Sequence, residues 1–156
     1  MKNAVVRVAT ALILLVSCAF PQQPRTAFNG TWKLAPQLSK FGPYSNQAVD
    51  VYTLNLSEPK LEIVHLFNGE RQWLEVVLDG KERNVIEAIS GATSAKGYWD
   101  ADTIVVEKRQ AIGGGSSTWT MRYSLSADGK VLTIQHHVLK SPVAPAFDEE
   151  RVYLRQ

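Results

Sequence analysis

Apolar and polar residues alternate in short runs from Phe28 to the end of the chain. The alternation is clearest over Ser117–Leu125, where Trp, Met, Tyr and Leu fall on one face and Thr, Arg and Ser fall on the other. A period of two is typical of a β-strand with one buried face. No window shows an amphipathic helix of useful length. The pattern therefore predicts an all-β domain.

Turn signals separate these runs. Asn68-Gly69, Asp79-Gly80 and Asp128-Gly129 suit the positive φ angles of two-residue hairpin turns. A sheet of consecutive hairpins has an edge strand with unpaired backbone groups on each side, and closing the sheet into a barrel removes these edges. We therefore predict a single antiparallel up-and-down β-barrel of about eight to ten strands, with a flat sandwich as the competing packing. The expected strands are Thr31–Leu34, Val49–Leu56, Leu61–Phe67, Gln72–Leu78, Glu82–Ile86, Ser94–Trp99, Thr103–Arg109, Ser117–Leu125, Val131–Val138 and Arg151–Leu154.

The first 18 residues have the pattern of a targeting signal. Two positive residues come before the apolar run Val8–Val16, which is too short to span a bilayer as a permanent helix. Leu15-Val16-Ser17-Cys18 resembles a bacterial lipobox, which implies that Cys18 is lipidated and anchors the chain to a membrane. The alternative is a soluble export signal cut near the same small residues. Both interpretations place the domain outside the cytoplasm, in the cell envelope, the periplasm or the medium.

Charge and composition exclude several classes of function and of structural stabilisation. The 156 residues contain 17 Lys and Arg against 15 Asp and Glu, and Lys2 and Arg7 of the signal account for the difference. A domain with equal numbers of positive and negative side chains lacks the excess positive charge that general nucleic-acid binding needs. One cysteine excludes a disulfide framework and a multi-cysteine zinc site. Residues 19–27 contain two Pro and two Gln and predict a flexible tether, so the barrel domain is expected over residues 28–156.

The two ends of this domain resemble those of the calycins, the lipocalins and fatty-acid-binding proteins. Phe28–Leu34 reads FNGTWKL and resembles their opening strand, and Glu150–Arg155 reads ERVYLR and resembles their closing strand. More specifically, the chain is similar to small exported bacterial lipocalin-like proteins of unassigned role. The resemblance implies that Trp32 plugs one end of the barrel and that Arg151 or Arg155 packs across its ring.

The chain also departs from these relatives between its first two strands. Fatty-acid-binding proteins carry two lid helices there, but Ala35–Ala48 contains Pro36, Gly42 and Pro43 and leaves room for a turn or a short 3₁₀ segment. The haem-binding relatives have a second Gly soon after Gly-x-Trp, whereas Lys33-Leu34-Ala35 follows here. We therefore expect no cofactor.

Candidate ligand contacts come from the closing strand. Arg151-x-Tyr153 matches the pair with which several fatty-acid-binding proteins hold a ligand carboxylate, and residues two apart on a strand point the same way. The alternative is that Val152 and Leu154 face the core while the Arg and Tyr face water. Arg122 is a further candidate anion contact. The preceding Glu149-Glu150 is interpreted as a solvated loop end.

The histidines and tryptophans supply further candidates. His136 shares its parity with apolar neighbours and is expected to face the interior, as is His65. His136 and His137 point to opposite faces and cannot chelate one ion, so no metal is expected. Trp119, with the aromatic side chains of the neighbouring strands, either lines a cavity for an apolar ligand or fills a solid core. Those neighbours are Phe67, Trp73, Tyr98 and Trp99.

No catalytic constellation stands out. Gly113–Ser117 lacks the order of a nucleophile elbow and of a phosphate loop. The sequence favours a monomeric, non-enzymatic binding or carrier domain for a small hydrophobic or amphipathic molecule. The alternatives are a structural or protein-interaction lipoprotein with a filled barrel, and a small hydrolase or isomerase. An interior space of at least about 300 Å³ favours the binding function.

Overall fold

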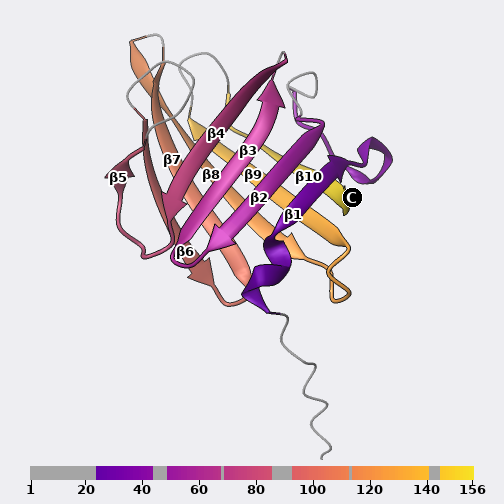
Figure 1. Cartoon of the computed structure of the whole chain (residues 1–156). Coiled ribbons are helices and arrows are strands. Elements are labelled where there is room, and N and C mark those ends of the chain that lie inside the picture. Colours follow the sequence, from indigo (N-terminus) through magenta and orange to yellow (C-terminus); the bar gives the residue numbers. More distant parts are fainter. Residues whose placement is uncertain (1–23, 44–48, 68, 86–92, 113, 141–144) are drawn as a thin grey trace, which may run out of the picture.

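Ten antiparallel strands form one sheet in the computed structural model, which describes residues 24–43, 49–67, 69–85, 93–112, 114–140 and 145–156. The strand order is β4-β3-β2-β1-β10-β9-β8-β7-β6-β5, so that β2–β4 face β7–β9 across the interior (Figure 1). The described helices are two 3₁₀ turns, η1 and η2. The bounds are η1 Arg25–Phe28, β1 Gly30–Leu34, η2 Pro36–Leu38, β2 Val51–Ser57, β3 Lys60–Phe67, β4 Glu70–Val77, β5 Arg83–Asn84, β6 Thr93–Asp100, β7 Thr103–Ile112, β8 Gly115–Leu125, β9 Val131–Lys140 and β10 Phe147–Arg155.

The predicted all-β barrel is confirmed, and each expected strand is present. The first and last strands pair, with Trp32 opposite Arg155 and Leu34 opposite Tyr153. The largest shift in a strand boundary is in β10, which begins at Phe147 and not at Arg151. Glu149 therefore lies in a strand and not in a loop, and its carboxylate becomes part of the barrel interior.

The barrel closes where β4 meets β6. Gly80 donates a backbone hydrogen bond of 2.8 Å to the carbonyl of Gly97. A Cβ atom on Gly97 would lie 2.5 Å from Cγ1 of Val76 and 2.8 Å from Cδ2 of Leu78. Only a glycine at this position lets the two strands approach so closely.

Gly97→Ala should therefore destabilise the protein by roughly 1–3 kcal/mol, since the added methyl group forces the packed strands apart. Urea denaturation of the purified protein measures the change in the free energy of unfolding. The same substitution in a Val76→Ala background should cost less, because the nearest clashing atom is gone. Equal costs in both backgrounds would contradict the role given to Gly97.

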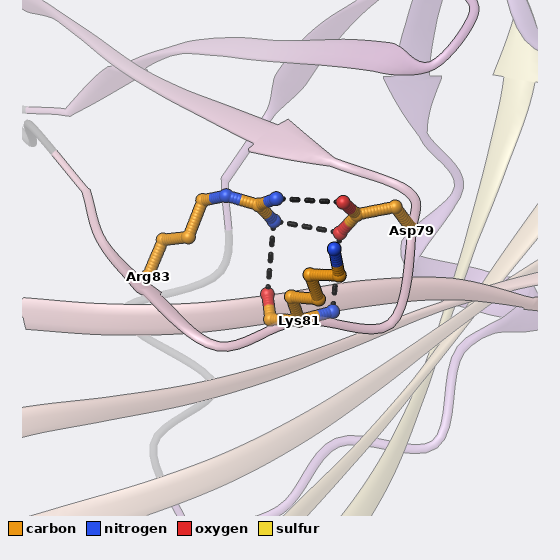
Figure 2. Close-up of polar contacts among 3 residues, drawn as sticks. All are labelled: Asp79, Lys81 and Arg83. Atoms are coloured by element: carbon orange, nitrogen blue, oxygen red, sulfur yellow. Dashed lines mark hydrogen bonds and ion pairs between the residues drawn. The ribbon is translucent and has the colours of Figure 1, made fainter.

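The connection from β4 to β5 is held by a bidentate ion pair. The guanidinium of Arg83 donates two hydrogen bonds of 2.6 Å to the carboxylate of Asp79 and a third, of 3.2 Å, to the carbonyl of Lys81 (Figure 2). The backbone N–H of Lys81 donates to Asp79 as well. Hydrogen bonding to Arg83 holds the pKa of Asp79 well below its ordinary value. Asp79 thus serves the turn geometry, as the sequence predicts.

Trp32 plugs the end of the barrel next to η1. Its side chain is 0 % exposed, and its Nε1 donates to the carbonyl of Phe28 over 3.1 Å. The guanidinium of Arg155 lies 4.2 Å from the ring centroid. Arg155 also donates to the carbonyls of Gly129 and Asn29, over 2.9 and 2.8 Å. The predicted stacking of an arginine on Trp32 is confirmed, and the arginine is Arg155.

The predicted tether ends earlier than expected. Arg25–Ala27 belongs to η1 and does not form an extended segment. Arg25 lies over the ring of Trp99 at 4.4 Å and pairs with Glu58 at 3.1 Å, so these residues are part of the domain. The signal residues 1–18 and the lipidation candidate Cys18 lie outside the described residues. Within the part of the chain that is described, no helix has the length and apolar character needed to cross a membrane.

The segment after β1 runs along β10. Its only helical turn among residues 35–43 is η2, so the predicted short 3₁₀ segment is confirmed there. Lys40 forms an antiparallel bridge with Glu150 on the edge of β10 that β1 leaves open. This places Gly42 beside the interior-facing residues of β10.

Candidate functional site

Arg151 and Tyr153 face the barrel interior. Both residues are buried, and Tyr153 belongs to the core cluster. Their neighbours point outward: Leu154 is 39 % exposed, whereas Val152 is covered by the segment that follows β1. Ser39 Oγ accepts a hydrogen bond from the backbone N–H of Val152 over 2.9 Å. The interpretation that places Arg151 and Tyr153 inside is confirmed, and the reverse orientation is wrong.

Arg151 is already paired with a carboxylate of the protein. Its Nη2 lies 2.5 Å from Oε1 of Glu149, and the exposed fractions of the two side chains are 8 % and 2 %. The other carboxylate oxygen accepts the backbone N–H of Gly42 over 3.2 Å. Nδ1 of His136 lies 3.7 Å from Oε1. We call His136, Glu149 and Arg151 the buried polar cluster.

The assignment of Glu149 to a solvated loop end is therefore wrong. Glu149 and Arg151 are two positions apart, so both side chains face the interior once β10 extends to Phe147. The odd-number parity shared by residues 149, 151 and 153 is the one sequence signal that could have identified it. The hydroxyl of Tyr153 is also satisfied by the protein, because it donates to the carbonyl of Val49 over 3.1 Å.

The titratable groups around the cluster are uncharged near neutral pH. Burial, and next the Arg151 guanidinium, lower the pKa of His136 to about 3. The Glu149 carboxylate does not offset this effect, because Arg151 already neutralises it. Burial raises the pKa of Tyr52, Tyr123 and Tyr153 above the ordinary value. The buried pair Glu149–Arg151 thus sits among neutral rings.

The stability of the protein should depend on pH through His136. The unfolded chain takes up a proton near pH 6.5 and the folded chain does so only near pH 3, so the free energy of unfolding falls as the pH decreases through this window. Between pH 6.5 and 5 the wild type should lose roughly 1 kcal/mol per pH unit more than His136→Gln. Urea denaturation across this range measures the slope.

A cavity of about 200 Å³ lies beside the cluster, at the end of the barrel away from Trp32. Its wall is mostly apolar and aromatic. Three of the lining residues make polar or cation–π contacts: His65 Nε2 lies 3.0 Å from Gln72 Oε1, and the Lys108 ammonium lies 5.4 Å from the Trp119 ring centroid. The lining residues are Tyr52, Ile63, His65, Leu74, Lys108, Gln110, Trp119, Met121, Tyr123 and His136.

Two predicted ligand contacts, His136 and Trp119, thus line the cavity, but other aromatic candidates do not. Trp99 packs edge-on against Phe28, with ring centroids 5.7 Å apart, at the opposite end. Trp73 lines a separate surface pocket with charged neighbours. The hydroxyl of Tyr98 donates to Glu107 over 2.9 Å. The side chain of Phe67 lies outside the described part of the structure.

Arg122 lies on the outer face of β8, where it pairs with Asp100 at 2.5 Å. It alternates with the cavity-lining Met121 and Tyr123, so the sheet separates it from the cavity. Arg122 therefore cannot contact a ligand inside the barrel, and its role as an anion contact stays a prediction for the outer face. Arg122 lines instead an outer groove of about 430 Å³ that contains Lys40, Phe41 and the His137–Asp148 pair. His136 and Glu149 of the buried polar cluster also line this groove, and His136 is shared with the inner cavity. The groove is larger than the inner cavity, and most of its lining residues are charged or polar.

Comparison with solved structures identifies the architecture. The apo lipid binding protein 8 of Caenorhabditis elegans superposes with a TM-score of 0.63 at 10 % identity, covering 84 % of this chain and 96 % of the other. A Schistosoma mansoni fatty acid binding protein in complex with arachidonic acid gives 0.59 at 13 % identity, covering 85 % and 98 %. The chain has a calycin-like fold. No family model and no curated protein matches the sequence.

This calycin-like barrel supplies a partner for each residue of its Arg-x-Tyr pair. Arg151 is neutralised by Glu149, and Tyr153 is hydrogen-bonded to Val49. The sequence assigned this pair to a ligand carboxylate, but the protein supplies both partners. Among the described residues, no group of three or more His, Cys, Asp or Glu side chains is placed to hold a metal ion.

Proposed function

We propose that this protein binds a small hydrophobic or amphipathic molecule inside the calycin-like barrel and does not transform it chemically. The observation that carries the proposal is the 200 Å³ cavity, in which an apolar wall is combined with a few neutral polar groups. Such a combination is typical of small-molecule sites. Two solved structures with this fold are described as a lipid binding protein and as a complex with arachidonic acid.

The size of the cavity limits the ligand. Its 200 Å³ is below the space of at least about 300 Å³ that we expected for a binding function, which is the lower end of the roughly 300–1,000 Å³ of most ligand pockets. It is nevertheless larger than an apolar cavity of about 150 Å³ that holds benzene in another protein. The enclosed part of the ligand is therefore about the size of one aromatic ring or a chain of six to eight carbons. A longer molecule would extend out of the cavity.

The location that we propose for this function is outside the cytoplasm. The signal-like residues 1–18 and the lipobox resemblance at Cys18 support export to the cell envelope. Intact mass spectrometry of the protein purified from its membrane fraction should show an acylated chain that begins at Cys18. A mature chain without added lipid mass would point to the soluble exported form.

Filling the cavity should abolish binding. Met121→Trp places an indole in the cavity from β8, and Thr120→Trp places the same side chain on the outer face of the same strand. Native mass spectrometry of the purified protein should show a co-purified small molecule in the wild type and in Thr120→Trp. It should be absent from Met121→Trp. Thermal unfolding of each variant reports whether the barrel remains folded.

The opposite outcome would favour the filled-barrel alternative. If the wild type carries no small molecule, and if titration with 1-octanol leaves the amide resonances of β8 and β9 unshifted, the cavity holds no ligand. The protein would then act through its surface, as a structural or protein-interaction component.

A further inference from the structure

Rings make up half of the side chains that line the inner cavity. Five of its ten lining residues carry an aromatic or imidazole ring, and the branched aliphatic ones are Ile63 and Leu74. The rings come from β2, β3, β8 and β9, which face one another across the barrel. The cavity therefore presents aromatic surface from opposite walls. The five residues are Tyr52, His65, Trp119, Tyr123 and His136.

Contacts within the protein hold these rings in place. The ring of Tyr52 packs edge-on against that of Tyr153, with centroids 5.2 Å apart, and lies 5.4 Å from the His65 ring. The hydroxyl of Tyr123 donates to the sulfur of Met121 over 3.5 Å. Because closely packed side chains resist displacement, the walls do not widen easily. The cavity is thus preorganised for a ligand that fits the space between the rings.

Such walls favour a planar aromatic ring. Aromatic rings attract one another in edge-to-face and offset arrangements, beyond the effect of burial. The sulfur of Met121 also makes favourable contacts with an aromatic ring. A saturated ring gains only from burial, and it is thicker because its carbons are puckered. The volume of about 200 Å³ admits one ring of either kind, so the chemistry of the wall makes the choice.

We infer that the cavity encloses an aromatic ring of its ligand and selects it over the saturated ring of the same carbon skeleton. This inference rests on the proposed binding function and names its ligand class. The indole of Trp119, on β8, is the largest ring of the wall and contributes most of the selectivity. Trp119 is half-buried, so its side chain can be shortened without opening a fully packed core.

The test compares benzyl alcohol with cyclohexylmethanol, which have the same carbon skeleton and the same hydroxyl group. Titrations of the folded wild-type protein, followed through the amide resonances of β8 and β9, should give benzyl alcohol an affinity on the order of three- to tenfold higher. Burial alone predicts the reverse order, because the saturated ring has more apolar surface. Trp119→Leu should abolish the preference, and Trp119→Phe should retain it.

Trp73→Leu is the matched control. The indole of Trp73 lines the separate pocket on the outer face of β4, so the variant should keep the wild-type preference. An unchanged preference in Trp119→Leu, or its loss in Trp73→Leu, would contradict the inference. Should Trp119→Leu fail to fold, intermolecular nuclear Overhauser effects in the wild type decide. Contacts between the ring protons of benzyl alcohol and the Trp119 indole are expected, and their absence would overturn the inference.

The remaining outcomes separate the inference from the proposed function. If the wild type binds cyclohexylmethanol as tightly as benzyl alcohol or more tightly, the inference is overturned and the binding function stands. The same conclusion follows if 1-octanol binds and neither ring compound does. If none of the three compounds binds, both proposals are overturned.

Discussion

Arg151→Met should destabilise the protein by about 3–5 kcal/mol. The substitution keeps an unbranched apolar side chain of similar length but removes the charge that compensates Glu149. The side chain of Glu149 is 2 % exposed, so its carboxylate would remain buried, with the N–H of Gly42 as the hydrogen-bond donor that it keeps. Urea denaturation at pH 7 measures the loss. Glu149→Gln/Arg151→Met should recover most of it, because no buried charge then remains unpaired.

A second arginine provides the matched control. Arg122 also lies 2.5 Å from a carboxylate oxygen, that of Asp100, but this pair is on the outer face. Arg122→Met should therefore change the free energy of unfolding by no more than about 1 kcal/mol. Similar losses for Arg151→Met and Arg122→Met would show that burial does not decide the contribution of the pair, against the structure described above.

Trp32→Ala should also cost roughly 3–5 kcal/mol, as a truncation of a fully buried aromatic side chain. The substitution removes the ring under the Arg155 guanidinium and the hydrogen bond to the carbonyl of Phe28. It therefore opens the end of the barrel where η1, β1 and β10 meet. Chemical denaturation gives the change in stability, and near-ultraviolet circular dichroism reports the altered packing of the remaining aromatic residues.

Trp73→Ala is the control for this truncation. Trp73 lies on the outer face of β4, where it is half-buried beside Glu75 and Val77. The expected cost is a fraction of that for Trp32→Ala, because less apolar surface returns to water. A loss of stability as large as that of Trp32→Ala would contradict the role of Trp32 as the plug of the barrel.

The fold could be predicted because its signals are local. Alternation over Ser117–Leu125 and the turn dipeptides near Gly69, Gly80 and Gly129 are properties of neighbouring residues, and all three glycines have a positive φ. Only Gly69 lies in a two-residue hairpin connection; the connection at Gly129 is longer, and β4 and β5, on either side of Gly80, do not pair with each other. The pairing of the first and last strands followed from the resemblance of the chain ends to calycins. These signals were sufficient to place ten strands in one barrel.

The candidate site was predicted only in part, because its decisive contacts are long-range. Phe147–Glu150 contains three consecutive acidic residues and does not alternate, so nothing local marks it as a strand. It is held by partners that are distant in sequence: Asp148 pairs with His137, and Glu150 pairs with Lys40. Without that strand, the interior position of Glu149 and its compensation of Arg151 could not be inferred.

The volume of the cavity is likewise not a local property. Parity placed His136 and Trp119 on the inner face, and both line the cavity. The alternation of residues between the two faces of a strand does not predict that the tryptophans at positions 73 and 99 pack elsewhere. It also does not predict that about 200 Å³ remains unfilled. Side-chain packing across the whole barrel determines that volume.

The central claim is that a small hydrophobic or amphipathic molecule occupies the inner cavity and not the outer groove. Intermolecular nuclear Overhauser effects between 1-octanol and the protein test this claim most directly, because the two locations present different protons. We predict contacts from the octanol chain to the methyl groups of Met121 and Ile63 and to the ring of Tyr52. Contacts confined to Phe41 and Thr120 in the outer groove, with none to these inner residues, would contradict it.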